Sequence, residues 1–417
     1  MLLITVDTLR VDRLSGYGYE RPTSPAADRL LRGGARFDQA RTVEPLTGPA
    51  CSSMLTSLYP HQHGAIRNGL RIRAQLPSLG KELDRVGYRT AAVVGNWTLK
   101  DSISGLAEHF DDFEEVLTRR RWLGLFAGEA TARDLEHAAA SWLDGNAGRR
   151  RPFFLWVHYV EPHAPYQLHR DFVRRLGLHS LAPVSKPDRY DTEIAAVDES
   201  LGRLVRRIES DSRLAANTLI VFTSDHGESL GEHGEWGHGP SLYEPALRIP
   251  LAFYWPGAIR PQRIGATASI LDVAPTVLAL LGRERPSDFQ GYDWSAVIAG
   301  RAAPPPARAT WFQTHKSTLL HLDDSRDELG HGLLQVGMVR GDRKEVVDLA
   351  RGERRVFDLR RDPRESARLE GGGGGPSPEL REWLQQVREA LAEGSTLPPA
   401  RLEDEDVERL RSLGYGD

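Results

Sequence analysis

Short apolar runs alternate with segments of helical character along most of this chain. The runs are too short for helices and are bounded by glycine, proline or polar residues, so they predict buried strands. These strands are expected at residues 2–6, 35–37, 90–94, 152–160, 219–222 and 249–254. Helices are expected at residues 26–32, 50–58, 79–86, 130–143, 190–209 and 270–281. This alternation predicts an α/β fold, with a mostly parallel central sheet and helices on both faces.

The pattern changes after Ala302–Pro306, whose sequence AAPPP predicts a linker. We therefore expect a large α/β domain over residues 1–300 and a small C-terminal α+β subdomain over residues 307–370. Antiparallel strands of the subdomain are expected at residues 310–312, 333–340, 344–348 and 356–359. Residues 371–417 predict a Gly-rich linker and a helical tail, with a helix at 378–391.

The predicted helix at 190–209 is amphipathic, with apolar residues at helical spacing along one side. We expect its acidic residues to lie on a solvated face.

Charge and composition exclude several classes of partner. The 417 residues carry 54 basic and 58 acidic side chains, a net charge of -4, without a basic stripe, so nucleic acid is not an expected partner. The mean hydropathy is -0.43, and no apolar run approaches the length of a membrane span, so no transmembrane anchor is expected. The oligomeric state is not indicated.

The single cysteine favours a reducing compartment, because it cannot form an intramolecular disulfide. The first predicted strand begins within two residues of Met1, which leaves no visible signal peptide. We expect a cytoplasmic protein from the sequence as written, and an exported one if a leader precedes it.

Acidic and imidazole side chains follow two of the predicted strands. Asp225 and His226 come directly after the strand at 219–222, and Asp7 follows the strand at 2–6. In an open α/β sheet, ligands bind at the carboxyl ends of the strands. Asp and His together suit a divalent cation of intermediate softness. A turn capped by Asp225 is the simpler alternative, but His233 and His238 follow in a polar Gly-rich loop and favour a site.

Thr47 lies between Pro45 and Pro49, just before the predicted helix at 50–58. A helix amino terminus offers unpaired N–H groups and a positive dipole to an anion. Thr47 is therefore a candidate binding or reacting residue, with a simple helix N-cap as the alternative.

Histidines mark a third polar loop, after the strand at 152–160. His163 follows a proline in this loop and is the better site candidate, whereas His158 lies within the strand pattern. We expect structural roles for His158, His61 and His63, with a second metal ion as the alternative.

The combined motifs resemble the sulfatase family of the alkaline phosphatase superfamily over nearly the whole chain. The resemblance is carried by Asp7-Thr8-Leu9-Arg10, residues 45–64, Pro162-His163-Ala164-Pro165-Tyr166, Ser224-Asp225-His226-Gly227-Glu228, Trp236-Gly237-His238-Gly239, the segment VFDLRRDP and the ending LRSLGYGD.

The resemblance implies an alkaline-phosphatase-like fold, with residues 1–300 as the catalytic domain. It implies one divalent metal ion held by Asp7, Asp225, His226 and the oxygen of Thr47. It further implies that His163 and His238 bind the substrate or protonate the leaving group, and that Asn68 contacts the ester oxygens.

Several positions depart from the sulfatase pattern. In the family's CxPxR motif the cysteine becomes a formylglycine nucleophile, but here that position is Thr47 and the arginine position is Cys51. Formylglycine is therefore not expected. Thr8 stands where the family usually has an acid after the first Asp. The family's GKWH segment appears here as Gly95-Asn96-Trp97-Thr98, so the cationic groups that bind sulfate are missing at Cys51, Asn96 and Thr98. A Thr nucleophile resembles the phosphodiesterase and phosphoethanolamine-transferase branches of the superfamily.

We therefore expect a metal-dependent hydrolase that cleaves phosphate or phosphonate diesters, or sulfate esters, through a Thr nucleophile and a covalent intermediate. The expected substrate is a small-molecule, glycan or lipid ester. Because His226 contributes an imidazole, Zn²⁺ or Mn²⁺ is favoured, with Ca²⁺ possible. The alternatives are a catalytically degenerate binding protein and a phosphoethanolamine-type group transferase.

Overall fold

The computed structural model describes residues 1–117, 119–121, 126–128, 130–146, 151–178, 184–316, 332–369 and 375–393. The predicted Gly-rich linker and the segment after residue 393, including the ending LRSLGYGD, lie outside the described residues. The domain boundaries at residues 300 and 307 stay a prediction.

The central sheet has eight strands in the order β12-β2-β11-β8-β1-β7-β3-β4. Their bounds are β1 (Leu2–Val6), β2 (Ala35–Arg41), β3 (Arg89–Val94), β4 (Asp112–Glu115), β7 (Phe153–Tyr159), β8 (Ile220–Ser224), β11 (Arg248–Tyr254) and β12 (Gln262–Ser269). All neighbouring pairs are parallel except those of β11, which is antiparallel to β2 and β8. This confirms the predicted fold class.

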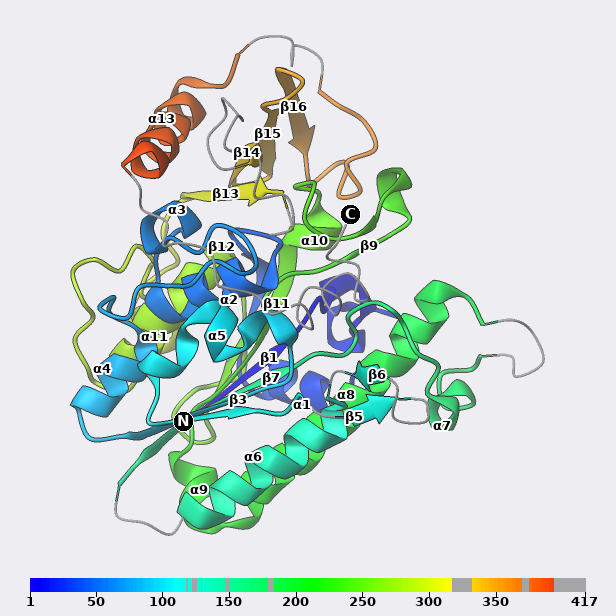
Figure 1. The fold of residues 1–417 in the computed structure, drawn as a ribbon, viewed down its shortest axis with the longest axis vertical. Helices are drawn as coiled ribbons and strands as arrows, with labels where there is room; N and C mark the ends of the chain where they lie inside the picture. The colour runs from blue at the N-terminus through cyan, green and yellow to red at the C-terminus, as the bar shows by residue number, and fades with distance from the viewer. Residues whose placement is uncertain are drawn as a thin grey trace.

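Helices cover both faces of this sheet (Figure 1). The described helices are α1 (Pro25–Gly33), α2 (Thr47–Thr56), α3 (Pro60–His63), α4 (Leu79–Arg85), α5 (Asp101–Ser104), α6 (Ala132–Asn146), α7 (Arg170–Val173), α8 (Lys186–Ser210), α9 (Ser212–Asn217), α10 (Glu244–Leu247), α11 (Val273–Leu280), α12 (Ser295–Ile298) and α13 (Pro378–Ala392). Within the described part of the chain, none combines the length and apolar character needed to cross a bilayer.

The alternation of side chains along β1 shows why two layers of helices are needed. Leu3 belongs to an apolar cluster that includes residues of α2, α4 and α11, whereas Leu2 and Ile4 belong to another that includes residues of α1, α6 and α8. Successive strand residues point to opposite faces. Because β1 is buried at every position, it must be covered on both sides.

A second sheet of four antiparallel strands lies at the top of Figure 1, with α13 beside it. Its strands follow chain order: β13 (Ala309–His315), β14 (Leu333–Arg340), β15 (Arg343–Asp348) and β16 (Glu353–Asp358). Trp383 and Leu384 of α13 pack with Val336 and Val347 in a separate apolar cluster. Two short hairpins complete the described strands: β5 (Arg119–Arg121) with β6 (Phe126–Gly128), and β9 (Ser229–Leu230) with β10 (Trp236–Gly237).

The two edge strands of the central sheet, β4 and β12, were not predicted from the sequence pattern. Each is partly exposed and mixes polar with apolar residues, because an edge strand has only one neighbour and need not be buried on both faces. The helix expected at 50–58 instead begins at Thr47.

The expectation that the acids of the 190–209 helix lie on a solvated face is wrong for three of them. Asp191, Glu193 and Asp198 are all buried. Asp191 accepts hydrogen bonds from Tyr19 at 2.6 Å and Arg21 at 2.7 Å. Asp198 accepts from the backbone N–H groups of residues 26 and 27, at 2.9 and 2.8 Å, in the first turn of α1. Helical periodicity shows which side faces the sheet, but not which acids find buried donors.

A buried ion network joins the two sheets. Glu244 of α10 lies 2.7 Å from Arg41 of β2 and 3.1 Å from Lys344 of β15, and Lys344 lies 2.7 Å from Glu365. Burial alone raises the pKa of Glu244, but the charges of Arg41 and Lys344 outweigh it and hold this pKa below its ordinary value. The Lys344 side chain is fully buried, so its charge depends on these two carboxylates.

We expect Lys344→Met to lower the free energy of unfolding by about 3 kcal/mol, because removing one partner leaves buried carboxylates without their counter-charge. The midpoint of urea unfolding, followed by circular dichroism, measures this loss. Arg343→Met, at the exposed neighbouring position, is the matched control and should change stability by no more than about 0.5 kcal/mol. Equal losses in the two variants would contradict a special role for the network.

Candidate active site

The candidate site lies at the carboxyl ends of three neighbouring parallel strands, β8, β1 and β7. Val6 pairs with Ser224 in the register of β1 and β8, so the next residues, Asp7 and Asp225, emerge side by side. On the other side of β1, Val6 pairs with Tyr159, which places the loop after β7 at the same edge.

Asp7, Asp225 and His226 converge at this edge and are completely buried. The Nε2 atom of His226 lies 3.7 Å from Oδ1 of Asp7 and 3.5 Å from Oδ2 of Asp225. Each carboxylate uses its other oxygen in the protein. Asp7 Oδ2 accepts from the Asn96 amide, and Asp225 Oδ1 accepts from the backbone N–H of His226 at 2.7 Å. The oxygens that face His226 have no hydrogen-bond partner.

His226 presents a lone pair to these two oxygens. Its Nδ1 lies 2.9 Å from the Gly227 carbonyl, which can only accept, so Nδ1 carries the proton. Burial lowers the pKa of His226 to about 3, so Nε2 is unprotonated at neutral pH. Three acceptor atoms thus face one another, and the donor beside them is the Thr47 hydroxyl, 3.4 Å from Nε2. The residues present fit a divalent cation, for which two carboxylates and an oriented imidazole are suitable ligands.

Electrostatics support the same fit. Burial and the negative charge of Asp225 raise the pKa of Asp7 well above its ordinary value, and burial also raises the pKa of Asp225. Among the described residues, no lysine or arginine forms an ion pair with either carboxylate. A cation between them would offset both effects.

Thr47 is brought to this cluster by helix α2. It is the first residue of the helix, is fully buried, and places its Oγ1 3.4 Å from Nε2 of His226. The N-cap position belongs to Leu46. The hydroxyl of Thr47 therefore stands at the positive end of a ten-residue helix and beside the candidate metal ligands.

Asn68 is held beside Thr47 by the same helix end. The backbone N–H of Gly48 donates to Asn68 Oδ1 at 2.8 Å, which assigns the amide oxygen. The Nδ2 atom is buried and has no partner. Asn68 therefore retains a free amide donor close to Thr47.

His163 and His238 form a second imidazole group next to the carboxylates. Their Nδ1 atoms lie 2.6 Å from the Ala164 carbonyl and 3.1 Å from the Pro45 carbonyl, so both Nδ1 atoms donate. The two Nε2 atoms are 3.2 Å apart and both present lone pairs. Burial lowers the pKa of each histidine to about 3, so both are neutral at neutral pH until nearby negative charge raises the pKa.

Strand β13 of the small sheet contacts both sides of the site. The backbone N–H of Gln313 donates to the Val43 carbonyl at 2.9 Å, and the backbone N–H of His315 donates to Oε1 of Glu44 at 2.9 Å. The hydroxyl of Thr314 donates to the Gly239 carbonyl. These contacts hold the segments that precede Thr47 and follow His238.

The predicted site residues are thus all found at one edge of the sheet, while their roles stay predictions. His61, His63 and His233 lie elsewhere: His61 is 2.9 Å from Gln313, His63 is 2.9 Å from Ser53, and His233 stacks on Tyr243.

Four further residues of this region were not assigned to the site from the sequence, although a second metal ion was the alternative role for His158. Three of them, Asn96, His158 and Cys51, contact or approach the two carboxylates. The fourth, Glu228, is buried, and its burial raises its pKa to about 8, with a smaller contribution from the negative charge of Asp7. Position at a strand end could have indicated Asn96, because it follows β3 as Asp7 follows β1. No signal in the sequence places Cys51 against His158.

Comparisons with known proteins agree with this arrangement. The family model described as Sulfatase matches residues 1–283. An N-acetylglucosamine-6-O-sulfatase of Bacteroides thetaiotaomicron is 24% identical over 476 residues, which cover 89% of this chain and 82% of that protein.

Two solved structures share the fold. One, in complex with its substrate D-glucosamine-2-N,6-O-disulfate, has a TM-score of 0.72 and 21% identity, and the match covers 97% of this chain and 99% of that one. A phosphonate monoester hydrolase from Silicibacter pomeroyi has a TM-score of 0.66 and 18% identity, with 94% of each chain covered. The match of the family model over more than half of the chain shows that this protein belongs to the sulfatase family.

Proposed function

We propose that this protein is a metal-dependent ester hydrolase in which Thr47, rather than a formylglycine, is the nucleophile. The observation that carries the proposal is the position of the Thr47 hydroxyl, at the amino terminus of α2 and 3.4 Å from His226 within the carboxylate cluster. Cys51 lies one helical turn further along α2, with its Sγ 3.9 Å from His158.

Asp7, Asp225 and His226, together with the Thr47 oxygen, would hold one divalent cation. A bound ion of this kind lowers the pKa of a hydroxyl and stabilises negative charge that develops during attack. The imidazole ligand favours Zn²⁺ or Mn²⁺ over Ca²⁺, which prefers oxygen ligands alone.

The reaction we propose has two halves. Thr47 Oγ1 attacks phosphorus or sulfur in line and releases its proton, a new ester bond forms to Thr47, and the bond to the leaving oxygen breaks. Water then cleaves the Thr47 ester and regenerates the hydroxyl. The amino terminus of α2 and the free amide of Asn68 stabilise negative charge on the non-bridging oxygens.

His163 and His238 handle the proton in this scheme. Their Nε2 lone pairs take up the proton that Thr47 releases, because the negative charge of the substrate raises the pKa of the imidazole that accepts it. The pair then passes this proton to the departing oxygen, takes one from the attacking water and returns it to the Thr47 oxygen as the Thr47 ester is cleaved.

The charge of the site favours an ester with a single negative charge. Asn68 contributes a neutral donor, and no lysine or arginine among the described residues pairs with Asp7 or Asp225. Sulfate monoesters, phosphate diesters and phosphonate monoesters each carry one negative charge, whereas a phosphate monoester carries up to two. The names of the relatives, which include a sugar sulfatase and a phosphonate monoester hydrolase, support the same group of substrates.

We expect Thr47→Ala to reduce kcat for aryl phosphodiester, phosphonate or sulfate substrates by at least about 10³-fold, because no other residue replaces the nucleophile. Thr47→Ser keeps a hydroxyl at the same place and should retain most of the activity. Initial rates on the three substrate classes measure both effects. Turnover that Thr47→Ala leaves unchanged would contradict the Thr mechanism.

Metal removal should abolish turnover. We expect chelator-treated protein to be inactive and to regain activity with Zn²⁺ or Mn²⁺ more than with Ca²⁺ or Mg²⁺, because imidazole is a better ligand for the first two. Rates after adding each ion singly measure this order. Metal binding without turnover on any of the substrates would instead indicate a binding protein.

His163→Gln should have an effect that depends on the leaving group. An alkoxide needs a proton as it departs and a nitrophenolate does not, so we expect a loss of about 10²-fold or more for alkyl esters and a much smaller loss for nitrophenyl esters. The ratio of kcat values for the two leaving groups measures the difference. Equal losses for both would show that His163 positions the substrate without donating a proton.

A further inference from the structure

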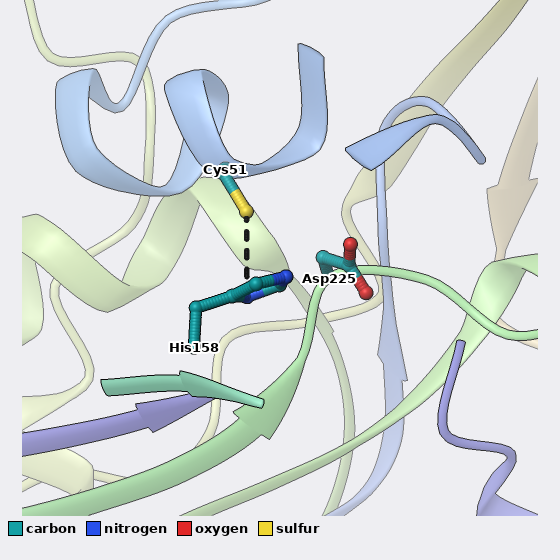
Figure 2. Close-up of side chains that lie close together, drawn as sticks. All are labelled: Cys51, His158 and Asp225. Atoms are coloured by element: carbon teal, nitrogen blue, oxygen red, sulfur yellow. Dashed lines mark hydrogen bonds between the residues drawn. The ribbon is translucent and has the colours of Figure 1, made fainter. Parts of the chain in front are cut away.

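Cys51, His158 and Asp225 form a second group of potential metal ligands next to the first. Figure 2 shows Cys51 of α2 and Asp225, from the loop after β8, on two sides of His158 near the end of β7. Each offers one ligand atom, and these atoms all lie within 4.8 Å of one another in a fully buried position. Asp225 is common to this group and to the group of Asp7 and His226.

His158 is contacted at its Nδ1 by Thr5 and, at 3.9 Å, by the Sγ of Cys51, whereas its Nε2 has no hydrogen-bond partner. Nδ1 lies 2.8 Å from Thr5 Oγ1, and this oxygen also accepts from the Trp156 indole at 2.9 Å. The Thr5 hydroxyl can direct its own proton to the Val157 carbonyl, at 3.4 Å, and so accept the His158 Nδ1 proton.

His158 Nε2 faces a carboxylate oxygen of Asp7. The Nε2 atom is buried, has no hydrogen-bond partner and lies 3.7 Å from Oδ2 of Asp7. The Oδ2 atom of Asp225 is likewise buried and unpartnered. An imidazole lone pair that faces carboxylate oxygens away from water is unfavourable unless a cation or a proton lies between them.

We propose that Cys51, His158 and Asp225 bind a second divalent cation of the Zn²⁺ class, with Asp225 shared between the two ions. A thiolate, an imidazole and a carboxylate form a ligand set typical of zinc. Donor atoms around tetrahedral Zn²⁺ lie roughly 3.3–3.8 Å apart, so a pair of ligand atoms at the 4.8 Å limit must approach each other by about 1–1.5 Å. Binding releases the thiol proton, because the thiolate is the ligand.

A second ion here would place positive charge beside the nucleophile. Cys51 and Thr47 are four residues apart on α2 and therefore lie on the same side of the helix. The site goes beyond the proposed hydrolysis and does not depend on it, because ion binding is measured without turnover.

Cobalt spectroscopy tests the proposal directly, because Cys51 is the only cysteine in the chain. Chelator-treated wild-type protein loaded with Co²⁺ should bind two ions and show a thiolate-to-cobalt charge-transfer band in the near ultraviolet. Cys51→Ser should bind one ion, show no such band and keep the wild-type circular dichroism spectrum. Full loading of the wild type without the band would overturn the proposal, whether or not the variant folds.

Thr47→Ala is the matched control, because it alters the first group of ligands and leaves the second intact. We expect this variant to keep the thiolate band while losing hydrolysis. A band with no hydrolysis in the wild type would sink the proposed function alone, and hydrolysis without a band would sink the second ion alone. Equal numbers of bound Zn²⁺ in wild type and Cys51→Ser, measured by elemental mass spectrometry, would also overturn the second site.

Discussion

The candidate site depends on two buried carboxylates at the ends of adjacent parallel strands. The register of β1 and β8 forces Asp7 and Asp225 together, away from water and without a lysine or arginine partner among the described residues. Burying two like charges costs free energy that burial of apolar strands must offset. The surrounding sheet, covered by helices on both faces, supplies that apolar burial and holds the strand ends rigidly.

Backbone carbonyls fix which ring nitrogen of each neighbouring histidine carries the proton. The Nδ1 atoms of His226, His163 and His238 each donate to a backbone carbonyl, those of Gly227, Ala164 and Pro45 respectively. Each histidine therefore directs an Nε2 lone pair into the site. The interior of the site is therefore rich in acceptors and poor in donors. Such a site selects cations and protons, and it binds an anion only through them, through the start of α2 and through Asn68.

The strands and the residues at their ends could be predicted from the sequence, whereas the contacts between distant elements could not. Apolar runs that end in Asp7 and Asp225 revealed the strands and the residues that leave them, because burial and strand ends are local properties. The adjacency of β1 and β8, and the contact of Cys51 with His158, depend on strand order and helix packing, which no local pattern encodes. Asp198 was misjudged because its partners, the first N–H groups of α1, lie more than 170 residues away.

The contacts of β13 show that the small sheet supports the candidate active site. The match to the family model ends at residue 283, whereas β13 begins at Ala309. Yet β13 bonds to Val43 and Glu44 just before the nucleophile helix, and to Gly239 just after His238. A truncated chain that stops at the family boundary would keep all eight central strands and every candidate ligand. It would lose the contacts of β13 with the segments on either side of the site, so we expect the smallest working enzyme to be longer than the region that the family model matches.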